Sequence, residues 1–462
     1  MTQTVNPALD QRRLETALTD AVATYVERNP GSLALFERAG KSLPGGNTRT
    51  GVFMDPFPLY ADRGEGVHLF DVDGHRLLDF VNNNSALILG HAHPRVVEAL
   101  QNQIPKGTGF SRPLAHEVEM AELLRERIPS LELLRFCSSG TEAVLNALRA
   151  ARAFTGRRKT AKFEGAYHGM DDHAMVSYLP PLGPDLGPDA RPLSVASTAG
   201  LNAGTLDDVV ILPFNDAAAC EAIIGDHADD LAAVIVDPVS TGAGLALPKE
   251  GFLSALRDMT RRAGALLVFD EIVSFRASAG GAQSLFDVRP DLTCLGKVVA
   301  GGTPGGIFGG RADIMALYDP TRGSPAIPQS GTYNANPFAL HAGLVTLRTM
   351  TAEAYDRLHE LTDEVAAGLQ RTFDAAGVPA SVVSVGSLFR VYFLPEPPRN
   401  YRQAARDNGA LHRWLHFSLL NRDVYWRQGG NVSLPMESQH VDALIATVGD
   451  CFADLQRSGV PA

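Results

Sequence analysis

The stretch ALLVFDEI, residues 265–272, carries the pattern that decides the fold of this chain. Its first five residues, Ala265–Phe269, are apolar without alternation, which is typical of a strand buried on both faces of a sheet. Two acids follow directly, Asp270 and Glu271. A carboxylate at the end of an apolar strand costs desolvation free energy unless it has a partner. Because open α/β sheets bind ligands at the carboxyl ends of their strands, a functional site is expected here.

Similar apolar runs recur between about residues 130 and 300, and segments of helical period separate them. This alternation predicts an α/β fold with a mostly parallel sheet and helices on both sides. We place this large domain at residues 81–335. The expected strands are Leu133–Cys137, Thr160–Phe163, Asp208–Leu212, Ala232–Val236, Ala265–Phe269 and Leu292–Leu295.

The two ends of the chain have a different character. Residues 11–41 predict two helices separated by a turn at residues 29–31, and two short strands follow. Beyond residue 335 long helical patterns flank a few strands, which predicts a smaller α+β domain over residues 336–462 that packs with the N-terminal segment, residues 1–80. The expected elements are the strands Val67–Asp71, Arg76–Phe80 and Ser387–Phe393, and the helices Phe338–Thr349, Ala352–Ala376, Tyr401–Leu420 and Glu437–Leu455.

Composition narrows the classes of function. The chain has 462 residues, of which 45% are hydrophobic and 20% charged, as in an ordinary globular protein. Its net charge of −11 argues against a nucleic-acid or anionic-membrane partner. No apolar stretch is long enough to cross a membrane, and the first residues do not resemble a secretory signal. Four cysteines without paired spacing indicate reduced thiols, so the expected location is cytoplasmic.

Four predicted strand ends carry candidate ligand-binding groups. Asp270 could meet a cationic ring nitrogen, and strand alternation would place Ile272 on the same face to cover the ring. The alternatives are a strand-end cap or a metal ligand. After Cys137, the residues Ser139, Gly140 and Thr141 open a helix whose free N–H groups favour phosphate, although an ordinary helix cap has the same sequence.

Lys297 is the candidate nucleophile. Among six lysines, we expect this one alone to lie in apolar surroundings, between a strand and the Gly-rich segment that follows it. Desolvation lowers the pKa of a lysine and favours the neutral, nucleophilic amine. The alternative is a lysine that extends from a helix edge to solvent. Tyr167 follows another predicted strand, next to His168, and could stack on a planar ligand; residues 330–334 form a second possible phosphate loop.

Together these groups specify a planar aromatic aldehyde that has a phosphate arm and a basic ring nitrogen, namely pyridoxal 5′-phosphate. A nucleotide-binding loop is disfavoured, because Asp291 occupies the position of the required upstream glycine before Lys297. A metal hydrolase would use His91, His93 and the segment 171–173 (Asp-Asp-His). The sequence predicts a loop for the two histidines and a solvated polar turn for the segment. We therefore predict no metal.

The same motifs resemble the class III pyridoxal-phosphate aminotransferases of fold type I, and the resemblance covers residues 35 to 455. It implies a seven-stranded sheet and a homodimer with shared active sites. It also implies a role for each candidate residue. Lys297 would form the Schiff base and move the proton, and Asp270 would pair with the ring nitrogen. Ile272 and Tyr167 would cover the two faces of the ring, with His168 next to Tyr167. The phosphate would be bound by Ser139, Gly140 and Thr141, and Thr332 would reach the phosphate in the partner subunit.

Within the family the chain is similar to glutamate-1-semialdehyde aminomutase, β-amino-acid aminotransferases and D-phenylglycine aminotransferase. Residues 43–49 and 63–66 match the β-amino-acid group, in which an arginine at the position of Arg49 binds the substrate carboxylate. Residues 47–50 and 424–429 depart from the aminomutase. The expected reaction is amino transfer between a β-amino or aryl-substituted amino acid and a 2-oxo acid. The alternative is intramolecular transfer in glutamate-1-semialdehyde.

Four further positions are left without a role. Asp237 stands where the family has glutamate before a proline, and a shorter acid has no predictable effect. A second substrate carboxylate would need another arginine. Arg390, Arg399 and Arg427 are candidates that the sequence does not rank.

Overall fold

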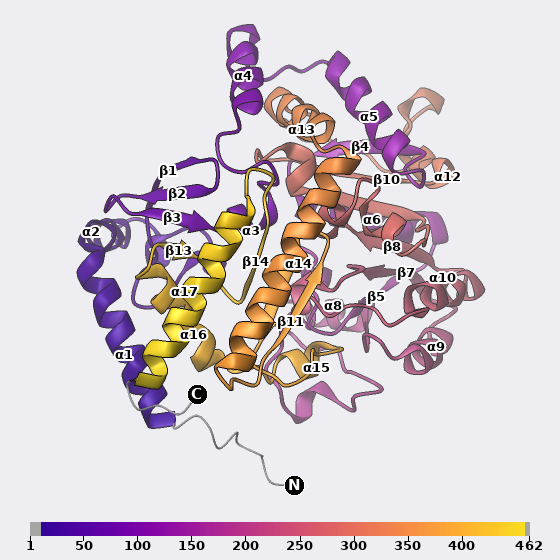
Figure 1. The fold of residues 1–462 in the computed structure, drawn as a ribbon. Coiled ribbons are helices and arrows are strands. Elements are labelled where there is room, and N and C mark those ends of the chain that lie inside the picture. Colours follow the sequence, from indigo (N-terminus) through magenta and orange to yellow (C-terminus); the bar gives the residue numbers. More distant parts are fainter. Residues whose placement is uncertain (1–10, 458–462) are drawn as a thin grey trace.

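The computed structural model describes residues 11–457 and contains a seven-stranded mixed sheet with helices on both faces (Figure 1). Four neighbouring pairs are parallel, and β10 is antiparallel to both of its neighbours. Helix α6 packs on one face, and α9 and α10 pack on the other. The strand order is β4 (Leu133–Cys137), β10 (Gly306–Gly310), β9 (Leu292–Gly296), β8 (Leu266–Asp270), β7 (Leu231–Val236), β5 (Lys159–Phe163) and β6 (Val209–Leu212). The three helices are α6 (Gly140–Thr155), α9 (Ala217–Asp226) and α10 (Phe252–Ala263).

The predicted α/β class and all six predicted strands of this sheet are confirmed, but the sequence did not indicate β10. Three of the five residues of β10 are glycines, which strands disfavour. Here glycine is required, because the neighbouring strands approach closely. A Cβ atom on Gly309 would lie 2.4 Å from the Leu133 carbonyl oxygen, and one on Gly310 would lie 2.1 Å from that of Asp291.

The two ends of the chain share a second sheet. Its order is β1 (Ala61–Glu65), β2 (His68–Asp71), β3 (Arg76–Asp79) and β13 (Val424–Tyr425), with β13 parallel to β3. A three-stranded sheet, β11 (Ser381–Val385), β12 (Leu388–Tyr392) and β14 (Gly429–Asn431), lies beside it. N-terminal and C-terminal segments therefore build one smaller α+β unit, whose predicted limits at residues 80 and 335 remain predictions.

Long helices cover this smaller unit. Helices α14 and α17 pack against each other, and α1 packs against α16 (Figure 1). The main helices are α1 (Gln11–Arg28), α2 (Pro30–Ala39), α4 (Pro94–Gln103), α5 (Ala115–Arg127), α13 (Pro337–Thr349), α14 (Ala352–Ala375), α16 (Gly409–Leu420) and α17 (Ser438–Arg457). The shorter ones are α3 (Asn82–Ser85), α7 (Asp172–Met175), α8 (Ala203–Asp208), α11 (Gly281–Leu285), α12 (Ala312–Met315) and α15 (Tyr401–Ala404).

The prediction of one helix over Tyr401–Leu420 was wrong. Helix α15 ends at Ala404, and α16 begins only at Gly409. The Asn408 side chain accepts a hydrogen bond from the Leu411 N–H at 3.1 Å and so caps the new helix. The break shapes one wall of the cavity described below.

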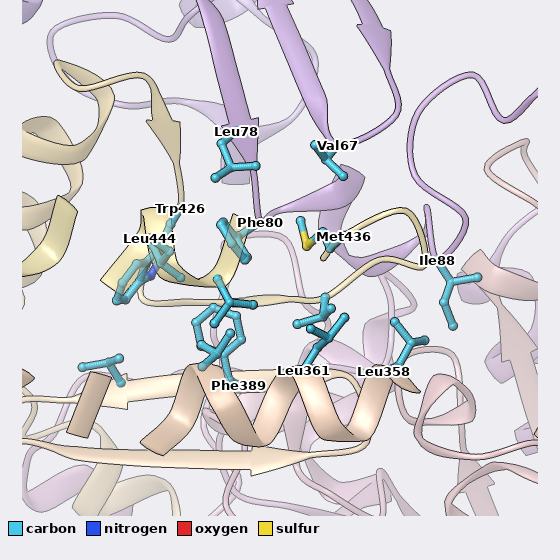
Figure 2. Close-up of a cluster of buried hydrophobic side chains, with 14 of the residues drawn as sticks. Val67, Leu78, Phe80, Ile88, Leu358, Leu361, Phe389, Trp426, Met436 and Leu444 are labelled. Atoms are coloured by element: carbon cyan, nitrogen blue, oxygen red, sulfur yellow. The ribbon is translucent and has the colours of Figure 1, made fainter. Parts of the chain in front are cut away.

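A buried hydrophobic cluster joins the N-terminal strands to the C-terminal segments (Figure 2). The Phe389 ring on β12 contacts the rings of Phe80 and Trp426 in edge-to-face geometry, with centroids 6.0 and 5.9 Å away. Leu358 and Leu361 of α14 belong to the same cluster and lie to the right of Phe389 in this view. Each such side chain contributes about 1.5–3 kcal/mol when fully buried, so this cluster holds the two ends of the chain together.

Among residues 11–457, no helix is both long and apolar enough to span a membrane.

Candidate active site

Lys297 begins the short 3₁₀ turn that follows β9, and its backbone is left-handed with φ of 51°. A non-glycine residue adopts this conformation only when its surroundings impose it. Burial lowers the pKa of Lys297 to about 8, opposed by the negative charges of Asp270 and Asp237 and assisted by the positive charge of Arg276. The predicted desolvation of this amine is therefore present in the structure.

Asp270 is buried at the end of β8, and His168 orients it. The His168 Nδ1 atom lies 2.7 Å from Asp270 Oδ2, while Oδ1 accepts a hydrogen bond from the Ile272 N–H at 3.1 Å. His168 is only 1% exposed, and within the described part of the chain its Nε2 atom has no hydrogen-bond partner. The imidazole of His168 thus holds the Asp270 carboxylate. The ring is buried, and only one of its two nitrogens has a hydrogen-bond partner.

Ile272 lies beside the candidate phosphate loop, although not for the predicted reason. Strand β8 ends at Asp270, so strand alternation does not reach Ile272. The side chain nevertheless packs against two glycines. A Cβ atom on Gly140 would lie 2.6 Å from Ile272 Cδ1, and one on Gly296 would lie 3.3 Å from Cγ2.

The Ser139–Thr141 segment opens α6, as predicted. Ser139 Oγ accepts a hydrogen bond from the Glu142 N–H at 3.2 Å, so this hydroxyl is an ordinary helix cap. Thr141 Oγ1 accepts one from the Met170 N–H at 3.3 Å. The first-turn N–H groups of a helix have no acceptor inside the helix, and they are the groups that could bind phosphate here.

Tyr167 and Thr332 are the most exposed of the predicted cofactor residues. Tyr167 is 42% exposed, and its ring centroid is 5.1 Å from that of Tyr178. Thr332 is exposed in a turn that touches the phosphate segment through its neighbour Asn334, whose Oδ1 accepts from Ser138 Oγ at 3.4 Å. Within one subunit Thr332 therefore does not join the buried group around Lys297.

A cavity of about 900 Å³ lies between the large sheet and the smaller unit. Thr241, Val273 and Gly302 line it from the side of the large sheet. Arg49, Arg390 and Arg427 line it from the N-terminal and C-terminal segments, whereas Arg399 does not. Arg49 is exposed and donates from Nη1 to Asn83 Oδ1 at 3.3 Å.

Arg49 and Arg427 both influence the pKa of a tyrosine that lines this cavity, Tyr425. Burial raises the pKa of Tyr425, and the positive charges of Arg427 and Arg49 both oppose that rise, whereas Asp79 adds to it. Tyr425 itself lines the cavity. Arg49, Arg427 and Tyr425 thus all belong to the lining of one cavity.

Asp237, which the sequence left without a role, is a second buried carboxylate beside Asp270. Its Oδ2 accepts hydrogen bonds from the Thr241 N–H at 2.7 Å and from the Thr241 hydroxyl. Burial raises the pKa of Asp237, and the nearby Asp270 carboxylate raises it further. Its contacts link the cofactor strands to the Thr241 loop of the cavity.

The prediction that Lys297 alone lies in apolar surroundings was wrong. Lys162 on β5 is 2% exposed, and its Nζ donates to the carbonyl oxygens of Ala174 and Val176 at 2.5 and 2.7 Å. Burial lowers its pKa to about 7. Its apolar neighbours Ala161 and Phe163 were the missed signal. Lys162 supports the loop after Tyr167. In contrast to Lys297, the negative charge of Asp270 does not influence its pKa.

The rival metal residues do not converge. His91 Nε2 lies 2.7 Å from Asp79 Oδ2, while Asp171 accepts from the His173 N–H to begin α7. Over the described residues, no group of three or more His, Cys, Asp or Glu side chains could hold a metal ion.

The residues present do fit pyridoxal phosphate. The site has an amine with a lowered pKa, a buried carboxylate and a helix N-terminus, at the carboxyl ends of β9, β8 and β4 respectively. The unpartnered Nε2 of His168 is a buried polar atom that the protein alone does not satisfy. A bound ligand at this position would account for that atom.

Comparisons with known proteins agree with this geometry. The model of the family "Aminotransferase class-III" matches residues 51–421. A glutamate-1-semialdehyde 2,1-aminomutase of Desulforudis audaxviator (strain MP104C) is 41% identical over 416 residues, which are 89% of this chain and 94% of that protein.

Solved structures give a second set of relatives. An omega-transaminase from Sphaerobacter thermophilus superposes with a TM-score of 0.90 at 43% identity, covering 93% of this chain and 99% of that one. A β-phenylalanine aminotransferase from Variovorax paradoxus superposes with a TM-score of 0.84 at 35% identity, covering 96% and 98%. The curated relatives thus carry the name of the predicted alternative, and these two structures carry aminotransferase names.

Proposed function

Because this chain belongs to the class III aminotransferases, we propose that it moves an amino group between an amino acid and a 2-oxo acid. The predicted resemblance, the enzyme class and the cofactor, pyridoxal phosphate, are confirmed at the level of the family. The donor that we propose is a β-amino or aryl-substituted amino acid. Its support is the position of Arg49 and the likeness to the β-phenylalanine enzyme.

The observation that carries this proposal is the set of three cavity arginines. Arg49, Arg390 and Arg427 come from separate segments, and none of them has a carboxylate within 4.0 Å among the described residues. A charged group at a cavity wall without a counter-ion is suited to an anionic ligand. An enzyme that accepts an amino acid and a separate oxo acid must bind more than one carboxylate, which suits several unpaired arginines.

The residues of the large sheet would carry out the chemistry. When bound, pyridoxal phosphate supplies a ring that accepts electrons from the substrate carbon. Asp270, held by His168, would pair with the ring nitrogen of the cofactor, and the first-turn N–H groups of Gly140 and Thr141 would bind its phosphate. Lys297 moves the proton, because an amine with a pKa near 8 can both accept and return it near neutral pH. Arg49 binds the carboxylate of the donor.

We further propose a homodimer. The exposed loop around Thr332 includes Tyr333, which is 68% exposed, and Met170 beside Thr141 is 64% exposed. Large apolar side chains next to a site favour burial by another surface. Thr332 would then reach the phosphate bound by the partner subunit. Light scattering at micromolar concentration measures the oligomeric state. A monomer that turns over at full rate would contradict the proposed homodimer.

The alternative is intramolecular amino transfer in glutamate-1-semialdehyde. The curated relatives, at 38–41% identity, support this alternative better than the aminotransferase. An aminomutase has no separate amino acceptor, so the requirement for an acceptor separates the two activities.

The experiment compares the holoenzyme with glutamate-1-semialdehyde alone and with amino donors (α-, β- and ω-amino acids and plain amines) plus pyruvate or 2-oxoglutarate. We expect product only when both a donor and an oxo acid are present, and none with Lys297→Ala. Conversion of glutamate-1-semialdehyde without an acceptor, together with no transfer from any donor, would establish the alternative and overturn the proposal.

A further inference from the structure

Lys162 is a buried lysine whose amine binds only backbone oxygens. It lies on β5, and its Nζ donates to the carbonyl oxygens of Ala174 and Val176. A lysine is almost never fully buried unless it is paired, yet among the described residues Lys162 has no ion pair with a carboxylate. Burial favours the neutral amine, whose two N–H donors match these two acceptors. The amine is thus suited to holding this piece of backbone.

The two acceptors of Lys162 lie at the end of helix α7. Ala174 is in the last turn of the helix, and Val176 follows the helix directly. The last carbonyl groups of a helix have no donor within the helix, and a lysine side chain can supply one. Both residues are buried, so without the amine their carbonyl groups would lose hydrogen bonds that water does not replace. Lys162 therefore fixes the backbone at the point where α7 ends.

The chain turns sharply at the next residue, Ser177, which is left-handed with φ of 51°. Its N–H donates to the Val195 carbonyl oxygen at 2.8 Å, and its own carbonyl oxygen accepts from the Gly165 N–H at 2.9 Å. A non-glycine residue keeps this conformation only when its surroundings impose it. The two hydrogen bonds of Lys162 lie immediately before this turn, and Tyr178 lies immediately after it. The direction in which Tyr178 leaves the turn is therefore set by these bonds.

Tyr178 packs on Tyr167, the residue that we propose covers one face of the cofactor ring. The two ring centroids are 5.1 Å apart and the rings are tilted by 55°, a distance at which aromatic pairs attract. The backbone of Tyr167 is fixed separately. A Cβ atom on Gly242 would lie 2.6 Å from the Tyr167 nitrogen, and the next residue, His168, binds Asp270. The half-exposed ring of Tyr167, in contrast, needs a neighbour that selects one orientation, and Tyr178 is in place to do so.

We propose that Lys162 is a positioning residue of the cofactor site. By binding the carbonyl oxygens that precede Ser177 it fixes Tyr178, and the Tyr178 ring holds the Tyr167 ring in the orientation that covers the cofactor. Lys162 acts without touching the cofactor itself. The inference rests on the proposed role of Tyr167. The chain thus uses its two buried lysines differently, with Lys297 as the reacting amine and Lys162 as a support for the ring cover.

The competing explanation is a lysine that only stabilises the end of α7, and a double-mutant cycle separates the two. The holoenzymes compared are the wild type, Lys162→Met, Tyr178→Ala and the double variant. Methionine keeps most of the length of the lysine side chain and removes its donors. Lys159→Met is the matched control, because Lys159 is the first residue of the same strand and pairs with Asp230 at 2.9 Å, at the end of β5 away from the site.

The quantity measured is the rate at which each holoenzyme releases pyridoxal phosphate after dilution, followed by absorbance. We expect Lys162→Met and Tyr178→Ala each to speed release by roughly 3- to 10-fold, as for the loss of one aromatic contact. The double variant should release the cofactor no more than about twofold faster than the quicker single variant, because both substitutions act through the same contact. Lys159→Met should change the rate by less than about twofold.

Effects that multiply in the double variant, or release from Lys162→Met at the wild-type rate, would overturn the inference. Tyr178→Ala leaves the buried carbonyl groups paired, so it tests the second step even when Lys162→Met does not fold. Unchanged release from Tyr178→Ala would overturn the inference as well.

Failure of the proposed cofactor role of Tyr167 gives a different result. Tyr167→Ala would then release pyridoxal phosphate at the wild-type rate, and the inference would lose its premise. Faster release from Tyr167→Ala, with unchanged release from both Lys162→Met and Tyr178→Ala, keeps the role of Tyr167 and removes the inference alone.

Discussion

The carboxyl end of the seven-stranded sheet, where we propose that the cofactor binds, and the adjacent cavity, where we propose that the substrate binds, are built in different ways. At the sheet, Asp270 is the last residue of β8 and Lys297 follows directly after β9, so each is close in sequence to the strand that positions it. In the cavity, Arg49, Arg390 and Arg427 come from segments far apart in the chain. The first region is encoded locally and can be recognised as motifs. The second exists only after the chain ends have packed together.

Arg276 connects the two regions. It lies in the turn after Asp270 and is fully buried, yet all its acceptors are neutral. Its Nε donates to Ser387 Oγ at 2.7 Å, and its terminal nitrogens donate to Ser85 O, Asn431 Oδ1 and Val432 O at 3.0, 2.7 and 2.6 Å. Ser387 and Asn431 belong to the segments that carry Arg390 and Gln428. The Arg276 side chain thus connects the cavity wall to strand β8.

The strongest test of the cofactor region is Lys297→Ala. Turnover should fall by roughly 10⁴-fold, because the amine that we propose moves the proton is lost while the fold is retained. Borohydride treatment of the wild-type holoenzyme, followed by peptide mass analysis, should find the cofactor on the peptide that contains Lys297. Lys162 is a second buried lysine with a lowered pKa, so attachment of the cofactor to Lys162 is the alternative outcome. Label on the Lys162 peptide would show that the wrong lysine had been chosen.

Arg276→Met should affect both regions and so tests the connection between them. Removal of the guanidinium leaves four buried acceptors unsatisfied, which we expect to cost about 2–4 kcal/mol of unfolding free energy. Denaturant unfolding of the holoenzyme measures this loss. The KM for amino donors should rise by at least about tenfold, because the cavity wall loses its support. Arg276→Lys, which keeps a charge and fewer donors, should recover part of the stability. Full stability of Arg276→Met would show that the four hydrogen bonds do not hold the two regions together.

Arg49→Ala tests the cavity alone. Arg49 is exposed and bound only through a neutral side chain, so its loss should leave the unfolding free energy within about 0.5 kcal/mol. We expect the KM for carboxylated donors to rise about 10-fold or more, with a smaller change for the corresponding amines without a carboxylate. Steady-state kinetics with a donor pair that differs only in the carboxylate measures this difference. An equal change for both donors would remove Arg49 from the carboxylate site.

The same contrast explains how much could be predicted from the sequence. The strands, Lys297 and Asp270 were recognisable because uninterrupted apolar runs and the residues after them form local patterns. Strand β10 was missed because close approach of its neighbours requires glycine, which strands otherwise disfavour. The burial of Lys162 depends on a loop that folds over it, although its apolar flanks were a visible sign. The arginines could not be ranked, because which of them reaches the cavity is decided by packing between distant segments.

The smallest effect that we predict is a pH dependence of cofactor capture. Burial lowers the pKa of Lys297 to about 8 from its ordinary value of 10.5, and only the neutral amine attacks an aldehyde. The capture rate of added pyridoxal phosphate by cofactor-free protein should therefore rise with pH through about 8 and become constant above it. Between pH 7 and pH 8 the neutral fraction grows from about one tenth to about one half, a roughly fivefold change. Stopped-flow absorbance measures the rate, with Lys297→Ala as the blank. A midpoint near 10.5 would mean that Lys297 is as well solvated as a surface lysine, and the cofactor region would then lack the local chemistry that distinguishes it from the cavity.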